Sequence, residues 1–382
     1  MCNYKTIFFV SDVKDPSKDA SSTQIMMRNI LSGFKQLGYQ VCFLAIVDKN
    51  CSRDNCKKYY SNVTDEIIFL NRITSTYGGA TKKMFSMLKS LFVMISDVDV
   101  FNKNNFEDCC VITHSPAIDS ILYAKVIKKF HPGVRIIQYW SDPITLSLKT
   151  IDEYRLKRCL FRYIENKVLS HGDVIVYGTK SLYDTQRIFF KRHSHKMGYC
   201  DVCFTTKDST KILHNKNEVF GYLGNYYSTI RNIIPLYKAF SKFSNGRLII
   251  CGSGDVKLMP RNNIAVHQRI PQNEILRLEE EIDIEICILN KVGFQVPGKI
   301  FYETDTNKKI LVILDGPQKD DIFDYLNQFK RFVFCENNEM SILKCLNDLS
   351  NGVYDEIDKS ELYRLTPQYI CQSIINGGNN DK

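Results

Sequence analysis

The stretch FGYLGNYYSTIRNIIPLYKAFSKFSNGRLIICGSGD, residues 220–255, decides the fold class. It begins with an apolar run at 220–223, passes through a loop into a segment of helical periodicity at 230–243, and ends with an apolar run at 247–251. A strand, a helix and a second strand in this order form a parallel βαβ unit, because parallel strands need a crossover connection. The chain is therefore predicted to have an α/β fold.

The same alternation continues on both sides of this stretch. Upstream, it predicts strands at 5–10, 41–47, 111–113, 135–139 and 173–177, with helices at 21–37, 118–130 and 154–169. Downstream, it predicts strands at 263–267, 283–289, 310–314 and 332–335, with helices at 273–280 and 297–305.

We expect two doubly wound Rossmann-like domains that face each other across a cleft. The N-terminal domain would cover residues 1–200 and the C-terminal domain residues 215–361. A last segment, 362–382, would form a helix that packs back on the N-terminal domain.

The composition predicts a folded protein without a membrane-spanning segment. Of the 382 residues, 44% are hydrophobic and 24% are charged, which is typical of globular domains. The longest uninterrupted apolar run, 41–47, is far shorter than the ~20 residues that cross a bilayer. The 14 cysteines are scattered and the amino terminus lacks a signal-peptide pattern, so we expect reduced thiols and a cytoplasmic protein.

The charge is distributed unevenly along the chain. Residues 1–195 contain 28 basic and 18 acidic side chains, a net charge of +10, whereas the remainder carries −1. This predicts an anionic partner for the first half, and the basic amphipathic segments 82–93 and 154–167 favour an anionic membrane surface. Core-facing helices with a solvated basic side are the alternative. Nucleic acid is not expected as a partner, because the chain lacks the usual nucleic-acid-binding modules.

Ligands of doubly wound sheets bind beyond the carboxyl ends of the strands, so residues that follow a strand are the first candidates. After the strand at 220–223, Gly224 would permit a close backbone approach, and Asn225 follows it. Arg231, expected in the opening turn of the next helix, would present a planar fork to phosphate oxygens. A solvated surface arginine is the alternative.

A second candidate loop leads from Asn290 to the helix predicted at 297–305. Pro297 suits the first helical position, and the free N–H groups at that helix start would form an anion site. Lys299 and Glu303 are four residues apart and would share one helix face. Either they form an exposed ion pair, or Lys299 lies near phosphate while Glu303 accepts hydrogen bonds from sugar hydroxyls.

Four short motifs in this half of the chain resemble those of a known enzyme family. They are Tyr222-Leu-Gly-Asn, Ile230-Arg-Asn, Leu248-Ile-Ile-Cys-Gly-Ser-Gly-Asp255 and Gln295-Val-Pro-Gly-Lys-Ile-Phe-Tyr-Glu303. In this order and spacing, the sequence resembles the retaining family 4 glycosyltransferases, which have the GT-B architecture. The first half matches that family only in its pattern of strands and helices.

The resemblance implies that the C-terminal domain binds a nucleotide-sugar donor and that the N-terminal domain contacts the acceptor. Arg231 and Lys299 would neutralise the leaving diphosphate, and Glu303 would bind the nucleotide ribose. Gln295 departs from the commonest family pattern, which has a glutamate there, but an amide still donates and accepts hydrogen bonds. The other residues expected to bind the donor are Gly224, Asn225, Asn290, Gly293, Phe294 and Pro297.

The expected reaction transfers a sugar with retention to a lipid-linked or surface-polysaccharide acceptor on the cytoplasmic face of a membrane. The leaving diphosphate would be stabilised by Arg231, Lys299 and a helix N-terminus. No Ser-His-Asp, Cys-His or paired-carboxylate arrangement presents itself as a nucleophile with its base. No cofactor is expected and no metal is required, since the two cations supply the charge and no Asp-x-Asp is placed to hold an ion.

In the first half, His114 follows the strand at 111–113 and Asp142 follows the strand at 135–139. Both are predicted as polar catalytic groups on the acceptor side. The alternative for His114 is a structural histidine with satisfied hydrogen bonds, and for Asp142 a helix cap or a turn before Pro143.

Two other functions stay open at this point. A nucleotide-sugar epimerase of the same architecture would need acid and base carboxylates, for which Asp142 is the one candidate that the sequence suggests. A non-catalytic donor-binding subunit would keep the donor site without turnover, and Gln295 is the residue that suggests it.

Overall fold

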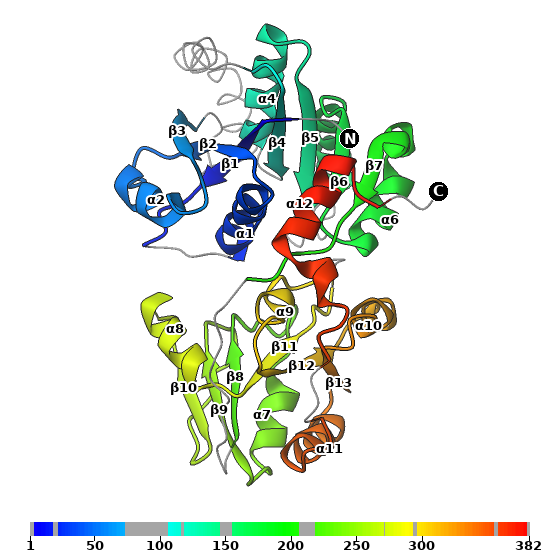
Figure 1. Cartoon of the computed structure of the whole chain (residues 1–382). Coiled ribbons are helices and arrows are strands. Elements are labelled where there is room, and N and C mark those ends of the chain that lie inside the picture. Colours follow the sequence, from blue (N-terminus) through cyan, green and yellow to red (C-terminus); the bar gives the residue numbers. More distant parts are fainter. Residues whose placement is uncertain are drawn as a thin grey trace. The chain divides into compact units, whose positions relative to one another are not determined.

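The chain forms two compact units, Met1–Val202 with Pro367–Lys382 and Cys203–Thr366 (Figure 1). The computed structural model describes residues 4–17, 22–72, 106–115, 118–145, 155–205, 218–270, 272–292, 296–354 and 358–379.

The first unit contains a parallel sheet of seven strands in the order β3-β2-β1-β4-β5-β6-β7. The strands are β1 Thr6–Val13, β2 Gln40–Val47, β3 Glu66–Asn71, β4 Cys109–Ser115, β5 Arg135–Trp140, β6 Val174–Tyr177 and β7 Met197–Tyr199. Its described helices are α1 Ser22–Gln36, α2 Arg53–Tyr60, α4 Ile118–Phe130, α5 Arg155–Leu169, α6 Lys180–Phe189, the 3-10 helix η1 Lys191–Lys196, and α12 Pro367–Asn376.

The second unit contains a parallel sheet of six strands in the order β10-β9-β8-β11-β12-β13. The strands are β8 Glu218–Leu223, β9 Gly246–Cys251, β10 Ile264–His267, β11 Ile284–Ile288, β12 Lys309–Leu314 and β13 Val333–Glu336. The helices are α7 Ile234–Phe240, α8 Gln272–Glu281, α9 Lys299–Tyr302, α10 Lys319–Asn327, α11 Glu339–Ser350 and the 3-10 helix η2 Leu362–Leu365.

Both strand orders define doubly wound sheets, which confirms the predicted fold class. In each unit the first strand has the second strand on one side and the fourth on the other. The chain direction of the crossovers reverses there, and such a switch point is where α/β sheets bind their ligands. In the second unit the switch point lies between β8 and β11, at their carboxyl ends.

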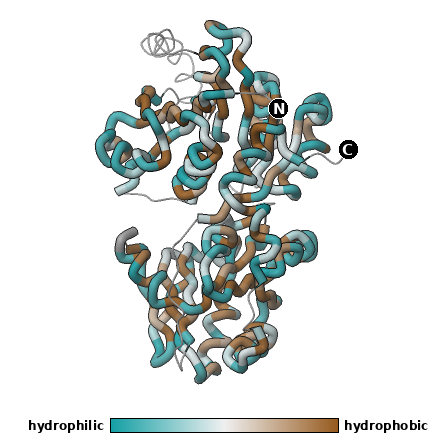
Figure 2. Tube along the Cα trace, in the orientation of Figure 1, coloured by the Kyte–Doolittle hydropathy of each residue, from teal (hydrophilic) through white to brown (hydrophobic). Residues whose placement is uncertain are grey.

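The central strands are buried because helices cover both faces of a parallel sheet. All seven residues 41–47 of β2 are buried, as are all five residues of β11. In each unit, hydrophobic segments follow the strands while hydrophilic ones follow the outer turns of the helices (Figure 2). Among the described residues, no helix is both long enough and apolar enough to cross a bilayer.

The periodicity of the C-terminal segment predicts one helix, but the structure has two: the 3-10 helix η2, followed by α12. Pro367 begins α12 and coincides with the boundary at which the chain returns to the first unit. There α12 lies against α1 (Figure 1), and the Cys371 thiol donates to the Ile30 carbonyl over 3.1 Å. A Cβ on Gly33 would come within 2.4 Å of the Pro367 carbonyl oxygen, so this close helix contact requires glycine.

Candidate active site

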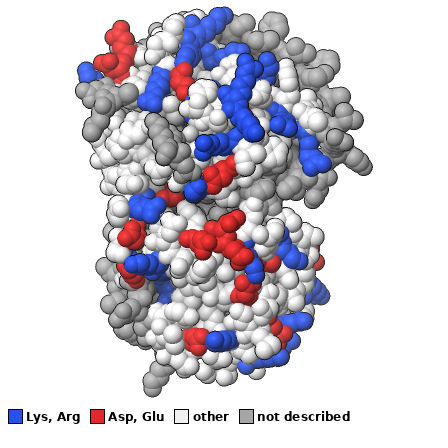
Figure 3. All heavy atoms as spheres, turned by 90° about the vertical axis from the view of Figure 1, so that its right-hand side faces the viewer, with Lys and Arg blue, Asp and Glu red and all other residues white. Residues whose placement is uncertain are grey.

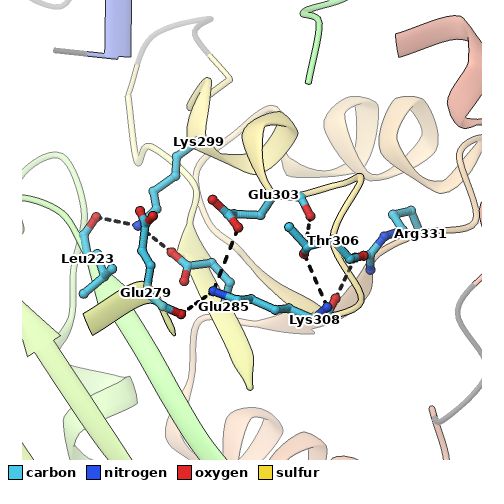
Figure 4. Close-up of polar contacts among 8 residues, drawn as sticks. All are labelled: Leu223, Glu279, Glu285, Lys299, Glu303, Thr306, Lys308 and Arg331. Carbon is cyan, nitrogen blue, oxygen red and sulfur yellow. Dashed lines mark hydrogen bonds and ion pairs between the residues drawn. The ribbon is translucent and has the colours of Figure 1, made fainter. Parts of the chain in front are cut away.

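The Lys299 ammonium lies at the switch point of the second sheet. Its Nζ donates to the carbonyl of Leu223, the last residue of β8, over 2.9 Å. It also forms an ion pair with Oε1 of Glu285, which belongs to the neighbouring strand β11 (Figure 4). The Lys299 side chain is 26% exposed, whereas the Glu285 side chain is 0% exposed. Lys299 therefore joins the two strands that define the switch point and keeps some access to solvent.

The charge of Lys299 depends on Glu285. Burial favours the neutral amine, but the Glu285 carboxylate, together with the smaller effects of Cys287 and Glu279, raises the pKa of Lys299 above its ordinary value. Burial likewise raises the pKa of Glu285, and Lys299 opposes that rise. Removing either partner would leave an uncompensated buried charge, which typically costs 3–5 kcal/mol.

Arg231 lies in the loop that follows β8, and its predicted place in the opening turn of a helix is wrong. Helix α7 begins only at Ile234, because Pro235 occupies its first turn and would break a helix that started at residue 230. Arg231 Nε donates to Oδ1 of Asn290 over 2.8 Å, and the Lys291 amide donates to the Ile230 carbonyl over 2.7 Å. The structure thus joins the loops after β8 and β11, which contain the two candidate segments of the sequence.

The two predicted cations converge on Tyr222 in β8. Burial raises the pKa of the Tyr222 phenol to about 12, and both Arg231 and Lys299 act against this rise through their positive charges. The phenol O–H donates to the Asn225 carbonyl over 2.9 Å. Both cations therefore act on one buried side chain at the carboxyl end of β8. Binding of one diphosphate by both would require such proximity.

The loop after β9 approaches the backbone of Gly224 closely at Gly252. The predicted approach of a ligand to Gly224 stays a prediction. A Cβ added to Gly224 would meet only the Tyr222 ring, at 3.8 Å. A Cβ added to Gly252 would come within 2.1 Å of the Gly224 carbonyl oxygen. Asn225 is exposed, and its side chain accepts a hydrogen bond from the Ser253 amide over 3.1 Å. These contacts fix the loop after β8 against the loop after β9.

The helix predicted at 297–305 is a single turn, Lys299–Tyr302, with Gly298 as its N-cap. Pro297 precedes the cap instead of occupying the first helical position. The amides of Ile300 and Phe301 already donate to the carbonyls of Pro297 and Gly298 over 3.1 and 3.0 Å. A single turn has little dipole and these two donors are used, which argues against an anion site at this helix start. The predicted phosphate contact there stays a prediction.

Glu303 does not form the expected exposed pair with Lys299. It ends α9, is 3% exposed, and lies 4.0 Å from Nζ of Lys308 (Figure 4). Its carboxylate thus turns into the unit, where the described structure gives a ribose no access to it. A ribose contact would need this segment to rearrange, so the predicted role of Glu303 stays a prediction.

Arg331 fixes the backbone that follows Glu303. The guanidinium is buried and donates to the carbonyls of Thr304, Thr306 and Lys308 over 2.9, 3.0 and 2.6 Å. Figure 4 shows Arg331 beside Lys308. Burial lowers the pKa of Arg331 to about 10, against the attraction of Glu303, so the side chain is still charged at neutral pH. One arginine thereby holds the loop between α9 and β12.

The three residues expected against the donor sugar, Gly293, Phe294 and Gln295, lie outside the described residues. So does the basic segment 82–93.

In the first unit, His114 and Asp142 differ in their access to a ligand. His114 belongs to β4, is 1% exposed, and pairs through its two ring nitrogens with the hydroxyls of Ser11 and Ser141 at 3.0 and 3.1 Å. Burial lowers its pKa to about 4, so the imidazole is neutral at physiological pH. This geometry favours the structural alternative for His114. Asp142 follows β5 and is half-buried.

Sequence reasoning missed three buried charged residues. Glu165 of α5 accepts hydrogen bonds from the amides of Ile144 and Thr145, so it holds the backbone just after Asp142. Glu285 could have been found, because a carboxylate inside the apolar run 284–288 needs a buried partner. Arg331 carries no comparable signal, since its partners are backbone carbonyls.

Within the described ranges, no group of three His, Cys, Asp or Glu side chains is placed to hold a metal ion.

Two Rossmann-like units of this topology define the GT-B class of folds. Among solved structures, the chain is similar to Anabaena HepE in complex with UDP and glucose, with a TM-score of 0.57, 10% identity, and 98% and 97% of the two chains covered. It is also similar to the lipopolysaccharide outer core galactosyltransferase WaaB, with a TM-score of 0.54, 11% identity, and 97% and 98% of the two chains covered. A third similar structure is a putative UDP-N-acetylglucosamine 2-epimerase from Listeria monocytogenes, with a TM-score of 0.52, 9% identity, and 98% and 95% of the two chains covered.

At such identities the likeness shows the fold alone. No protein-family model and no curated protein sequence matches the chain.

Proposed function

We propose that the chain is a glycosyltransferase that moves a sugar from a nucleotide-sugar donor, with retention, to a lipid-linked or surface-polysaccharide acceptor. The observation that carries the proposal is the placement of Arg231 and Lys299 at the switch point of the second sheet, where Lys299 donates to the Leu223 carbonyl and Arg231 to Asn290. The HepE structure of the same fold was solved with UDP and glucose, and WaaB is a galactosyltransferase, which supports this choice of substrates.

In this proposal the protein stabilises the departing diphosphate. Arg231 has a planar fork of five N–H donors, of which Asn290 takes one. Lys299 has three donors, and its contacts with Leu223 and Glu285 account for two. The remaining donors would meet phosphate oxygens as negative charge develops on them. One preorganised contact of this kind is worth about 10²–10³ in rate.

The acceptor proton needs no protein base in this scheme. His114 is buried with both ring nitrogens engaged, which argues against a role as base. In the family that the sequence resembles, the donor phosphate itself takes the proton, and we propose the same here. Asp142 is retained as a polar group on the acceptor side.

Nucleotide binding is the first prediction of this proposal. We expect one nucleoside diphosphate, from a panel of UDP, GDP and ADP with their sugars, to stabilise the protein in thermal unfolding. At about 100 times its dissociation constant the ligand adds about 2.7 kcal/mol to the free energy of unfolding. A panel without any shift would contradict the proposed donor site.

The two alternatives differ from the transferase in their products. An epimerase would convert the selected nucleotide sugar without an acceptor, whereas the transferase leaves its sugar configuration unchanged. A non-catalytic subunit would bind the nucleotide but transfer no sugar to an acceptor extract. Incubation of the donor with and without the extract therefore distinguishes all three.

We further propose that α5 and α6 form a surface that contacts anionic lipid. Arg162 of α5 donates to the Phe189 carbonyl of α6 over 3.0 Å and stacks on its ring, so the two helices present one surface. Figure 3 shows Lys and Arg gathered over the first unit. The exposed apolar side chains of this α5–α6 surface are Leu160, Tyr163, Ile188 and Phe189, and its exposed cations are Arg158, Arg162, Lys167 and Arg187. Lys191 and Arg192 of η1, which follows α6, are exposed as well.

Few negative charges oppose this surface. Between residues 158 and 196, Glu165 is buried, and Asp173 and Asp184 are paired with Lys128 and Lys180. A surface with exposed apolar side chains and cations that have few acidic neighbours suits the interface of an anionic membrane. There each basic residue contributes about 1 kcal/mol to the binding free energy.

The membrane prediction is tested by sedimentation with phosphatidylglycerol vesicles. We expect binding in low salt, release in high salt, and no binding to phosphatidylcholine vesicles. Ile188→Asp should weaken binding about tenfold, because it removes an apolar side chain and adds a repelled charge. Met340→Asp is the matched control, since Met340 is even more exposed but lies on α11 of the second unit. Equal sedimentation of the protein at low and high salt would contradict the lipid contact.

A further inference from the structure

We propose that Glu285 is a positioning residue that holds the Lys299 ammonium at the switch point for its anionic ligand. The inference rests on the proposed function and names a residue that the sequence motifs do not include. Glu285 lies inside β11, among Ile284, Ile286 and Cys287, and its side chain is fully buried. An ionised carboxylate in such a place is retained only with a charged partner.

The geometry makes Lys299 that partner. Lys299 Nζ contacts Oε1 of Glu285. The other lysine drawn in Figure 4, Lys308, lies near Glu303 and donates to the Glu279 carbonyl. Glu285 Oε2 has no hydrogen-bond partner within the described part of the chain. Among the described residues, the Glu285 carboxylate therefore forms an ion pair with Lys299 and no other ion pair or hydrogen bond.

The pair also fixes where the ammonium can be. Lys299 sits on a single helical turn, and its long side chain has many rotamers, so α9 alone does not place Nζ. The Leu223 carbonyl on β8 and the Glu285 carboxylate on β11 restrain Nζ from two neighbouring strands. Without the carboxylate one neutral acceptor would remain, and the ammonium would move among several positions.

The charge of Lys299 is the second quantity that Glu285 sets. Several titratable groups interact electrostatically with Lys299. They are Tyr222 on β8, Cys251 on β9, Glu279 on α8, and Glu285 and Cys287 on β11. Among them, Glu285 is the strongest influence that keeps the amine protonated against burial. Its removal should therefore lower the pKa of Lys299, and the ammonium would lose its proton at lower pH.

The first measurement needs neither substrate nor activity. Trace acetylation with acetic anhydride, read by peptide mass spectrometry, follows the free amine of each lysine as a function of pH. Exposed Lys257 is the internal reference, and wild-type Lys299 should reach half of its maximal rate at a higher pH than this reference. In Glu285→Gln the midpoint of Lys299 should fall by at least about one pH unit, while Lys257 is unchanged. Wild-type Lys299 that titrates like Lys257 would overturn the proposal, even if the variant does not fold.

The second measurement uses sugar transfer. Glu285→Gln should lower kcat about tenfold or more without raising the donor KM, because the variant loses the placement of Lys299 and also a carboxylate that repels the donor. The alkaline limb of its pH–rate profile should move to lower pH. Glu285→Asp should restore part of kcat. Glu274→Gln changes an exposed position on α8 and should have the kcat and the pH–rate profile of the wild type. A purely structural role would not move the alkaline limb.

The two proposals fail in different ways. A wild-type protein that neither binds a nucleoside diphosphate nor transfers sugar would contradict the proposed function, and the acetylation midpoints would still decide whether Glu285 holds Lys299. If transfer occurs but Glu285→Gln keeps the wild-type kcat and midpoint, Glu285 has no positioning role.

Discussion

Arg231→Ala should lower the rate of sugar transfer about 10²–10³-fold, which makes it the largest expected effect on activity. The guanidinium is held toward the switch point by Asn290, and the charge that it would stabilise develops on the leaving diphosphate. An alanine removes every donor of the fork at once. The measurement is kcat with the donor selected by thermal shift, at saturating donor and acceptor.

Two control variants make this result specific to the site. Arg231→Lys keeps the charge but loses the planar fork, so it should recover only part of the rate. Arg277→Ala removes an exposed arginine of α8 and should leave the rate within twofold of the wild type. The free energy of unfolding of Arg231→Ala should change little, because Arg231 lies in a loop and is only half-buried. Wild-type turnover by a folded Arg231→Ala protein would remove Arg231 from the site.

Arg331→Ala should have a large effect on stability, lowering the free energy of unfolding by about 3–5 kcal/mol. The substitution removes the donors to the Thr304, Thr306 and Lys308 carbonyls and leaves these acceptors without them in a largely buried place. Each buried acceptor that loses its donor costs about 1–3 kcal/mol. The measurement is urea unfolding followed by circular dichroism.

Arg331→Lys is the informative companion variant. Its ammonium keeps the positive charge near Glu303 but cannot reach three carbonyls in the geometry of a guanidinium fork, so we expect an intermediate loss. Arg277→Ala should again change the free energy of unfolding by less than about 0.5 kcal/mol. A loss below about 1 kcal/mol for Arg331→Ala would mean that water or other donors replace the guanidinium.

The positions of turn-forming residues explain where the sequence-based helix bounds were wrong. Periodicity placed a helix over 230–243, but Pro235 lacks an N–H and fits only the first turn, so α7 begins at Ile234. For α9, Pro297 marked a helix start correctly to within two residues. Nothing in the periodicity showed that the helix would end after one turn, where Arg331 holds the following backbone.

The candidate cations could be predicted, but their partners could not. Spacing along the chain suggested that Lys299 pairs with Glu303, four residues away on an assumed helix. Instead the ammonium pairs with Glu285, and Glu303 lies near Lys308. Likewise, the sequence did not show that His114 is enclosed between Ser11 and Ser141. Such pairings form between strands and loops whose separation along the chain carries no information about distance.

The sequence by itself determined the α/β class, the succession of most strands and helices, and the residues that follow the strands at a switch point. It did so because hydrophobic periodicity and turn residues act locally. Only the tertiary structure decided which charges are buried together and which counter-ion keeps Lys299 protonated. The physical reason is that an ion pair inside a sheet depends on burial and on strand order, and both arise when distant parts of the chain pack together.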